Sequence, residues 1–184
     1  MSNDIKTGPD HIRALRDGRE IYLDGVRVDD VTTHPAFRNA VAAAAALYDF
    51  QAAPENREWM TFPRPSGKAD GYARINRCWQ RPRSYDELVA RRRALTAWAE
   101  LSCGYLGRAP DHVASSMVGQ VLGIEVFRRH GADRAAALLD YFDYVSRHDH
   151  YLSYVIINPQ ADRSKAWGEQ DDDLVARIVD EDPG

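Results

Sequence analysis

Apolar residues at three- and four-residue spacing, interrupted by Pro and Gly, are the feature that most restricts how this 184-residue chain can fold. One such run begins after Pro35 and ends before Pro54. Its apolar face consists of Phe37, Val41, Ala44, Ala45 and Tyr48. Three further runs follow, from about residue 84, from Pro110 and from about Asp133. Because this period gathers apolar side chains on one helical face, the sequence predicts four substantial helices and a mainly α fold class.

Local signals predict where the second of these helices begins and ends. Ser84 and Glu87 have the spacing of a capping box, in which Ser84 is the N-cap and Glu87 reaches back to the N–H of Ser84. Either Gly104 or Gly107 is expected to end this helix. Inside it, residues 91–93 (RRR) are interpreted as a solvated face.

The two remaining helices are separated by a His-Gly pair. Pro110 suits a first helical turn, and the apolar period predicts a helix that continues to about Arg129. His130-Gly131 predicts a stop, and Asp133 is expected to cap the last helix. The period then continues to about Tyr154, shortly before an Asn-Pro pair.

Short segments near both ends of the chain have strand character instead. Apolar and polar residues alternate on both sides of Asp24-Gly25, a pair that favours the tight turn of a β-hairpin. Residues 174–179 (LVARIV) also alternate, and they predict one strand. Residues 54–83 are rich in Pro and Gly, and we expect them to be irregular and to cover a surface. Because a strand without a partner leaves backbone groups unpaired, we expect the chain to be a fragment of a larger fold.

Composition excludes several classes of protein. A net charge of −4 gives no electrostatic argument for binding nucleic acid or an anionic membrane. A polar start without a signal peptide, and the lack of a long apolar run, indicate a cytoplasmic protein. Cys78 and Cys103 are too few for a disulfide scaffold or a zinc site, so we expect two reduced thiols.

Residues 148–150 (HDH) resemble a metal-binding pattern. Two histidines separated by one residue point about 200° apart on a helix, so they cannot share an ion there. We therefore interpret the triplet as a solvated helix end and expect no metal site.

Residues 107–112 (GRAPDH) stand at the junction between two predicted helices. Gly and Pro bracket Arg108 at a helix start, where the helix dipole also favours anions. His112 lies in the first turn of the same helix. These residues are compatible with an interhelical salt bridge and with an anion or phenolate site.

Three blocks of the sequence resemble the 4-hydroxyphenylacetate 3-hydroxylase family. The first comprises residues 17–22 (DGREIY), 25–28 and 30–39 (DVTTHPAFRN). The second runs from residue 98 to residue 111 and contains GYLGRAPD, and the third is residues 158–163 (NPQADR). The blocks stand in the family's order over about residues 11–165.

The resemblance implies a fold similar to that of acyl-CoA dehydrogenases. In this family an N-terminal helical domain precedes a central β-domain and a C-terminal four-helix bundle that forms tetramers. Residues 1–160 are then the N-terminal helical domain, with a small N-terminal β-hairpin. Residues 161–184 are the start of a truncated β-domain, with its first strand.

The resemblance also implies an activity. Family members are oxygenase components of two-component flavin-dependent monooxygenases, to which a separate NAD(P)H-dependent reductase supplies reduced FAD. With O₂ they hydroxylate a phenol ortho to its hydroxyl group. The chemistry requires that the phenol be polarised towards phenolate and that water be kept away. Alone, the fragment is expected to be inactive.

The resemblance assigns substrate and cofactor contacts to particular positions. The arginine that holds the phenolic oxygen in the family matches Arg108. The tyrosine four residues later is His112 here, and the histidine before the Asn-Pro pair is Tyr154. This exchange predicts either that the two groups act from swapped positions or that the substrate differs. The flavin contacts correspond to Tyr154, Val155, Ile156, Ile157, Gln160, Ala161, Asp162 and Arg163.

Two alternatives accompany this interpretation. The chain could be a non-catalytic helical module or paralogue that binds a partner. The family also contains 4-hydroxybutyryl-CoA dehydratase, whose iron–sulfur cluster needs several cysteine thiolates. Cys78 and Cys103 stand 25 residues apart without further cysteines, which argues against that member.

Overall fold

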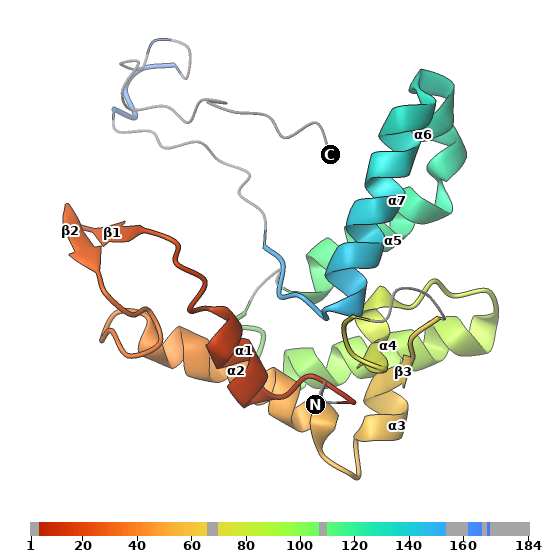
Figure 1. Cartoon of the computed structure of the whole chain (residues 1–184), viewed down its shortest axis with the longest axis horizontal. Coiled ribbons are helices and arrows are strands. Elements are labelled where there is room, and N and C mark those ends of the chain that lie inside the picture. Colours follow the sequence, from red (N-terminus) through yellow and green to blue (C-terminus); the bar gives the residue numbers. More distant parts are fainter. Residues whose placement is uncertain (1–3, 66–69, 107–109, 154–161, 167–168, 170–184) are drawn as a thin grey trace. The chain divides into compact units, whose positions relative to one another are not determined.

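The computed structural model describes residues 4–65, 70–106, 110–153, 162–166 and 169 (Figure 1). The chain divides into two units, Met1–Leu152 and Ser153–Gly184. The helices and strands described below all lie in the first unit. In chain order these elements are α1 (Gly8–Ala14), β1 (Ile21–Leu23), β2 (Val26–Val28), α2 (Arg38–Ala52), α3 (Arg57–Met60), β3 (Thr61–Pro63), β4 (Arg74–Asn76), η1 (Arg77–Trp79), α4 (Tyr85–Leu101), α5 (Asp111–Leu122), α6 (Ile124–His130) and α7 (Ala132–Arg147).

The predicted mainly α class and the predicted N-terminal hairpin are confirmed. β1 and β2 pair antiparallel, with Ile21 opposite Val28. Asp24 and Gly25 both have positive φ, 51° and 76°, as a two-residue hairpin turn requires. The predicted strand at residues 174–179 lies outside the described residues. Within the described part of the chain, no helix is long and apolar enough to cross a membrane.

The segment expected to be irregular instead contains a second small hairpin. β3 and β4 pair antiparallel, with Phe62 opposite Ile75, and α3 and η1 flank them. Each strand has only three residues, which is too short for an alternating pattern to show in the sequence. Ile75 is buried, so the hairpin contributes to the core and does more than cover a surface.

Close packing on α2 comes from α1, which lies alongside it in Figure 1. The N–H of Gly8 donates to the Asp49 carboxylate at 2.8 Å. A Cβ at Gly8 would lie 2.8 Å from the Ala45 carbonyl oxygen and 2.5 Å from an Asp49 oxygen. Glycine is therefore required at this contact, where α1 packs closely against the backbone of α2.

The start of α4 follows the predicted capping box in one half only. The Ser84 side chain accepts from the Glu87 N–H at 3.2 Å, as expected. Glu87 Oε2 accepts instead from the N–H of Arg83, one residue before the N-cap, at 2.6 Å. The carboxylate thus satisfies a free donor just outside the helix.

The helix expected from Pro110 to about Arg129 is two helices, which is a correction. Gly123 separates α5 from α6 with φ −93° and ψ 23°. Glycine is a weak helix former, while the apolar period continues across it and hides the break. The last helix also starts differently, because Gly131 is the N-cap and Asp133 makes no side-chain cap.

α7 ends at Arg147, about seven residues earlier than the sequence predicts. Asp149 takes a positive φ of 46°, and the N–H of His150 donates to the Val145 carbonyl oxygen at 2.9 Å. The N–H of Asp149 donates to the Ser146 carbonyl oxygen at 3.0 Å. These two bonds form a Schellman motif with an aspartate where glycine is usual, so no sequence signal marks the stop.

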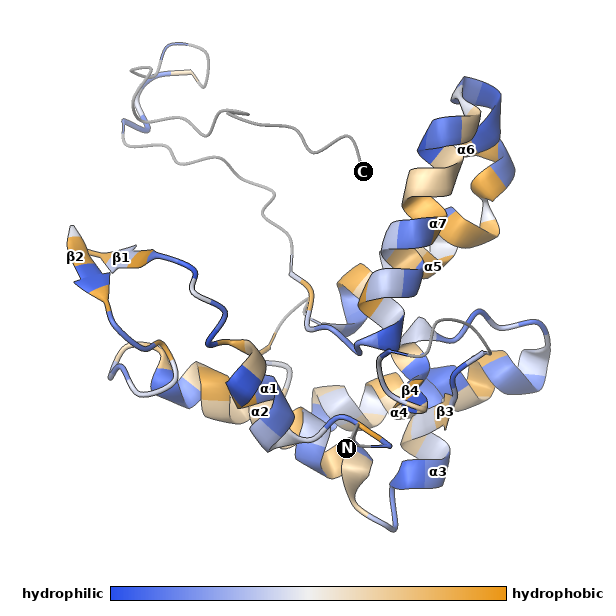
Figure 2. Cartoon of the chain, viewed as in Figure 1, coloured by the Kyte–Doolittle hydropathy of each residue, from blue (hydrophilic) through white to orange (hydrophobic). Residues whose placement is uncertain are grey.

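The core joins η1 and the middle helices. Its largest fully buried apolar side chains are Trp79, Tyr48, Leu47, Met60, Ile75 and Val145. Figure 2 shows that α2, α4, α5 and α7 each carry both hydrophobic and hydrophilic residues, as helices with one buried face do.

The buried polar centre of the unit is Asp149, which is 1% exposed. Its carboxylate accepts from Trp79 Nε1 at 3.0 Å and from Gln51 Nε2 at 2.8 Å. Its carbonyl oxygen accepts from Lys6 Nζ at 2.8 Å and from the Tyr48 hydroxyl at 3.0 Å. The interpretation of residues 148–150 as a solvated helix end is therefore wrong for Asp149.

Burial raises the pKa of the Asp149 carboxyl, against the opposing effects of nearby Lys6 and of the bonds from Gln51 and Trp79. Burial likewise lowers the pKa of Lys6, while Asp149 and Asp10 oppose that shift. The cluster of charges is thus costly to bury, and the hydrogen bonds offset the cost.

We predict that Asp149→Asn destabilises the chain by about 1–3 kcal/mol, because one of two buried N–H donors then faces an NH₂ group. Gln51 cannot simply turn, since its Oε1 accepts from Asn76 Nδ2 at 2.8 Å. Asparagine tolerates positive φ, so the backbone is unaffected. Urea unfolding measures the change, and exposed Asp140→Asn in α7 is the control. Equal stability of the two variants would contradict the role of the carboxylate.

The histidine stacked on this cluster predicts a dependence on pH. The His11 ring lies 5.0 Å from the Tyr48 ring, and burial, helped by Lys6, lowers the pKa of His11 to about 4. The unfolded chain therefore binds a proton at His11 before the folded chain does, and stability falls as pH drops from 6.5 to about 4. His11→Phe keeps the ring and should flatten this fall in urea unfolding series. The exposed His130→Phe should leave it unchanged, and an unaltered slope in His11→Phe would refute the assignment.

Candidate functional site

The predicted substrate site is centred on the junction between α4 and α5. The structure places His112 in the first turn of α5, exposed, as the sequence predicts. Arg108 and Tyr154 lie outside the described residues. The structure therefore locates one of the three predicted catalytic residues and does not test whether they meet.

Arg91 holds the first turn of α5 in place. From α4, its Nη2 donates to Ser115 Oγ at 2.7 Å and to the Cys78 carbonyl oxygen at 2.9 Å. Ser115 Oγ in turn donates to the carbonyl oxygen of Asp111, the first residue of α5, at 2.7 Å. The turn that carries His112 is thus tied to both α4 and η1.

Burial lowers the pKa of Arg91, while Cys78 and Asp111 act in the opposite direction. The buried Nε of Arg91 has no hydrogen-bond partner among the described residues. A guanidinium remains charged under these conditions. It therefore adds a fixed positive charge close to the helix start.

The interpretation of residues 91–93 as a solvated face is wrong for Arg91. Arg92 and Arg93 are exposed, whereas Arg91 points towards η1 and α5. Buried Ala94 and Trp98 follow Arg91 at three and seven residues, so the three side chains share a helical face. The sequence contains that spacing, but the spacing does not identify the acceptors in η1 and α5 that hold Arg91 there.

Tyr151 belongs to the short segment that follows α7. Tyr151 packs against the core, and its ring lies 5.5 Å from the His11 ring. Burial raises the pKa of Tyr151, and the charge of Asp111 acts in the same direction. Tyr151, three residues before Tyr154 in the sequence, thus contacts His11 and is influenced by the charge at the first residue of α5.

A small hollow lies at the junction itself. It has a volume of about 50 Å³, and Trp98, Leu106, Pro110 and Asp111 are among the residues that line it. Sites for small molecules usually have roughly 300–1,000 Å³. The described residues alone therefore enclose too little space for a complete substrate site.

The predicted flavin contacts fall mostly outside the described residues, namely Tyr154, Val155, Ile156, Ile157, Gln160 and Ala161. Asp162 and Arg163 are described and belong to the second unit. Asp162 Oδ1 accepts from the N–H and the hydroxyl of Ser164, at 2.9 and 2.6 Å, which lowers the pKa of Asp162. Arg163 is exposed and carries a guanidinium of the kind that pairs with a phosphate.

The remaining candidates for chemistry are histidines and cysteines. The rings of His148 and His150 lie 5.6 Å apart, because they follow the end of α7 and are not opposed on a helix. In the described ranges, no group of three or more His, Cys, Asp or Glu side chains has the arrangement of a metal site. Cys78 and Cys103 are free thiols, and burial raises the pKa of Cys78.

Comparison with known proteins identifies relatives over the whole chain. A family model described as the 4-hydroxyphenylacetate 3-hydroxylase N terminal matches residues 7–184. The oxygenase component of 4-hydroxyphenylacetate 3-monooxygenase from Geobacillus sp. (strain PA-9) is 36% identical over 98% of this chain and 36% of that protein. The oxygenase component of 4-nitrophenol 2-monooxygenase from a Rhodococcus species is 37% identical over 100% of this chain and 34% of that protein.

A solved structure gives the same result. The oxygenase component of 4-hydroxyphenylacetate 3-monooxygenase, complexed with FAD and 4-hydroxyphenylacetate, matches with a TM-score of 0.76 and 30% identity. The match covers 91% of this chain and 33% of that one. This chain therefore spans about a third of the length of the relatives it matches. The family model, the identities and the shared fold agree, and they show that the chain belongs to the 4-hydroxyphenylacetate 3-hydroxylase family.

Proposed function

We propose that this chain is the N-terminal helical part of the oxygenase component of a two-component flavin-dependent monooxygenase. The reaction is hydroxylation of a phenol ortho to its hydroxyl group, with reduced FAD and O₂ as co-substrates. The observation that carries the proposal is the match to an oxygenase structure that holds FAD and 4-hydroxyphenylacetate. The chain corresponds to a third of that protein, so the activity belongs to an assembly with further domains.

The proposed substrate contacts are Arg108, His112 and Tyr154. A guanidinium beside the phenolic oxygen favours the phenolate, which activates the ring at its ortho position. His112 and Tyr154 both donate and accept hydrogen bonds, so they can divide the proton transfer at this oxygen between them. In this proposal the two groups act from positions that are exchanged relative to the family pattern.

Two observations support a site at this place. Arg91 and Ser115 fix the helix turn that carries His112. Tyr151, three residues before Tyr154 in the sequence, packs against the core, and the charge of Asp111 helps to raise its pKa. His112 is exposed, so the site needs a cover from the rest of the protein to exclude water.

Reduced FAD would supply the activation of O₂ when bound. The residues proposed to hold it are Tyr154, Val155, Ile156, Ile157, Gln160, Ala161, Asp162 and Arg163. Of the two described ones, Arg163 suits a phosphate of the cofactor, whereas Asp162 is engaged by Ser164. Backbone groups in this segment would make several of the other contacts.

The wider organisation follows from the same proposal. Residues 1–160 form the helical domain, and residues 161–184 begin the central β-domain. The partners are a flavin reductase that uses NAD(P)H and other copies of the complete subunit in a tetramer. We place the reaction in the cytoplasm.

Flavin binding and turnover test the proposal directly. We expect the full product of the gene, with reduced FAD, O₂ and a phenol, to form a catechol, which liquid chromatography detects. The 184-residue chain alone should form none, because it supplies only part of the flavin site. Absence of catechol from the full product with 4-hydroxyphenylacetate and with 4-nitrophenol would favour the alternative of a non-catalytic helical module.

A substitution tests the assignment of His112. In the full product, His112→Phe should lower kcat/KM for hydroxylation by about 100-fold, since positioned acid–base groups contribute roughly 10²–10⁴-fold. His130→Phe, in an exposed residue at the end of α6, is the matched control and should retain the activity. An equal effect of both substitutions, or no effect of His112→Phe, would remove His112 from the site.

A further inference from the structure

A large cavity in the first unit is formed by residues that the predicted phenol and flavin sites do not use. It has a volume of about 550 Å³, within the range of roughly 300–1,000 Å³ that is usual for small-molecule sites. Its walls come from β3 and β4, from Trp79 at the end of η1, from residues 80–83, from the first turn of α4 and from α7. Residues between Phe62 and Glu87 thus converge on one space with a helix more than 40 residues further along the chain.

The floor of the cavity is apolar. Phe142 and Trp79 meet edge to face with ring centroids 6.0 Å apart, and both are at least 92% buried. Phe62, Ile75 and Leu139 complete this surface. Binding of an aromatic or other apolar group to this floor is therefore favourable, because it removes apolar surface from water.

The rim is rich in positive charge. Arg81 and Arg83 line the cavity, and neither side chain forms an ion pair with a described residue. The Arg81 guanidinium lies 5.8 Å from the centre of the Phe142 ring, at the edge of the apolar floor. Such a group pairs well with a carboxylate or a phosphate.

The two carboxylates of the lining are already engaged. Asp143 Oδ2 accepts from Arg147 Nη1 at 2.6 Å. Glu87 Oε2 accepts from the backbone N–H of Arg83 at 2.6 Å. Neither of these bonds uses the guanidinium of Arg81 or Arg83, so these two cations remain available to a ligand.

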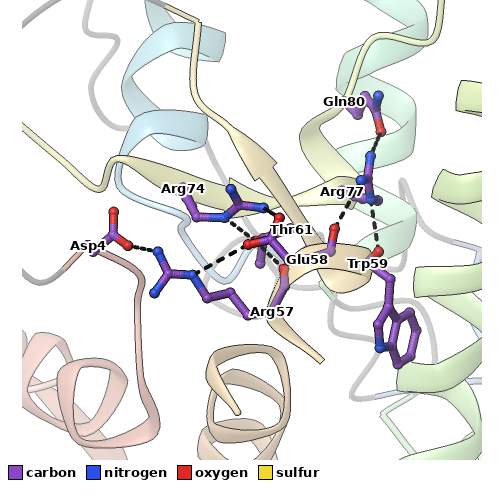
Figure 3. Close-up of polar contacts among 8 residues, drawn as sticks. All are labelled: Asp4, Arg57, Glu58, Trp59, Thr61, Arg74, Arg77 and Gln80. Atoms are coloured by element: carbon purple, nitrogen blue, oxygen red, sulfur yellow. Dashed lines mark hydrogen bonds and ion pairs between the residues drawn. The ribbon is translucent and has the colours of Figure 1, made fainter. Parts of the chain in front are cut away.

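Gln80 adds an oriented neutral donor to the lining. Arg77 Nη1 donates to Gln80 Oε1 at 2.8 Å, and Figure 3 shows the Gln80 nitrogen turned away from Arg77. Because arginine only donates, the amide orientation is fixed. Gln80 Nε2 has no acceptor among the described residues, although the residue is only 9% exposed.

The wall that carries these donors is rigidly held. Arg77 also donates from Nε to the Trp59 carbonyl oxygen at 2.8 Å and from Nη2 to the Glu58 carbonyl oxygen at 3.2 Å (Figure 3). One guanidinium thus joins α3 to the start of residues 80–83. A site organised before binding loses less entropy when a ligand enters.

We propose that this cavity binds a small organic anion, with an apolar body on the Phe142 floor and a carboxylate or phosphate held by Arg81, Arg83 and Gln80. All three polar groups are donors, which excludes a cation as the preferred ligand. The inference does not depend on the proposed hydroxylase function, because it uses no flavin and none of the predicted substrate contacts.

Isothermal titration calorimetry of the 184-residue chain, without flavin, tests this inference. The probes are phenyl phosphate and benzoate, which differ in the anionic group, together with inorganic phosphate and neutral phenol. We expect phenyl phosphate, benzoate or both to bind at least tenfold more tightly than inorganic phosphate and phenol. The stronger of the two identifies the anionic group, and added salt should weaken its binding.

Variants assign any binding to the cavity. Arg81→Gln and Arg83→Gln should each weaken it at least tenfold, whereas Arg92→Gln removes an equal charge from an exposed residue of α4 outside the cavity and should not. Circular dichroism and thermal unfolding verify that all three variants fold. The inference is overturned if neither aromatic anion binds with a Kd below about 10 mM, which is the range of very weak ligands. It is also overturned if the three variants bind alike, or if inorganic phosphate binds as tightly as the aromatic anions.

Discussion

The buried Asp149 is the residue on which the rest of the first unit depends. Its two carboxylate oxygens and its carbonyl oxygen accept from Trp79, Gln51, Lys6 and Tyr48. These donors belong to η1, to α2 and to the N-terminal segment, so one residue at the end of α7 connects elements from across the chain. Burying a charge is costly unless it is fully hydrogen-bonded, and this requirement fixes the relative position of the connected elements.

The same residue determines where the proposed functional segment begins. The positive φ of Asp149 stops α7 and redirects the chain, so that the Tyr151 ring lies tilted against the His11 ring. The charge of Asp111, at the start of α5, helps to raise the pKa of Tyr151. Arg91 fixes that helix start through Ser115. In our proposal these residues support the substrate contacts without touching the substrate themselves.

A comparable device positions the arginine-rich cavity. Arg77 binds the carbonyl oxygens of α3 and the Gln80 amide, and thereby holds the segment that carries Arg81 and Arg83. Figure 3 shows that Arg57 and Arg74 lie in the same region, where Arg57 pairs with Asp4 and Arg74 with Glu58. Arg77 here and Arg91 at the start of α5 act in the same way, because the several donors of one guanidinium reach more than one element.

The sequence by itself determined the helical class, the first hairpin and the family. The apolar period and the Asp24-Gly25 turn are local signals, and the family motifs are contiguous blocks, so none of them needs knowledge of tertiary contacts. The family is confirmed by the comparisons, and the roles of Arg108, His112 and Tyr154 stay predictions. Local signals did not predict the break at Gly123, because the apolar period continues across it. They did not predict β3 and β4 either, because a strand of three residues is too short to show an alternating pattern.

Only the tertiary structure decided that the side chains of Asp149 and Arg91 point into the protein. Both looked like solvent-exposed charges, because charged side chains usually are. Asp149 is buried since donors from residues as far away as Lys6, 143 positions earlier, converge on it. Arg91 turns inward since η1 and α5 offer it two acceptors. Whether a charged residue is exposed or buried depends on partners that are distant in sequence, and these partners are specified only when the chain has folded.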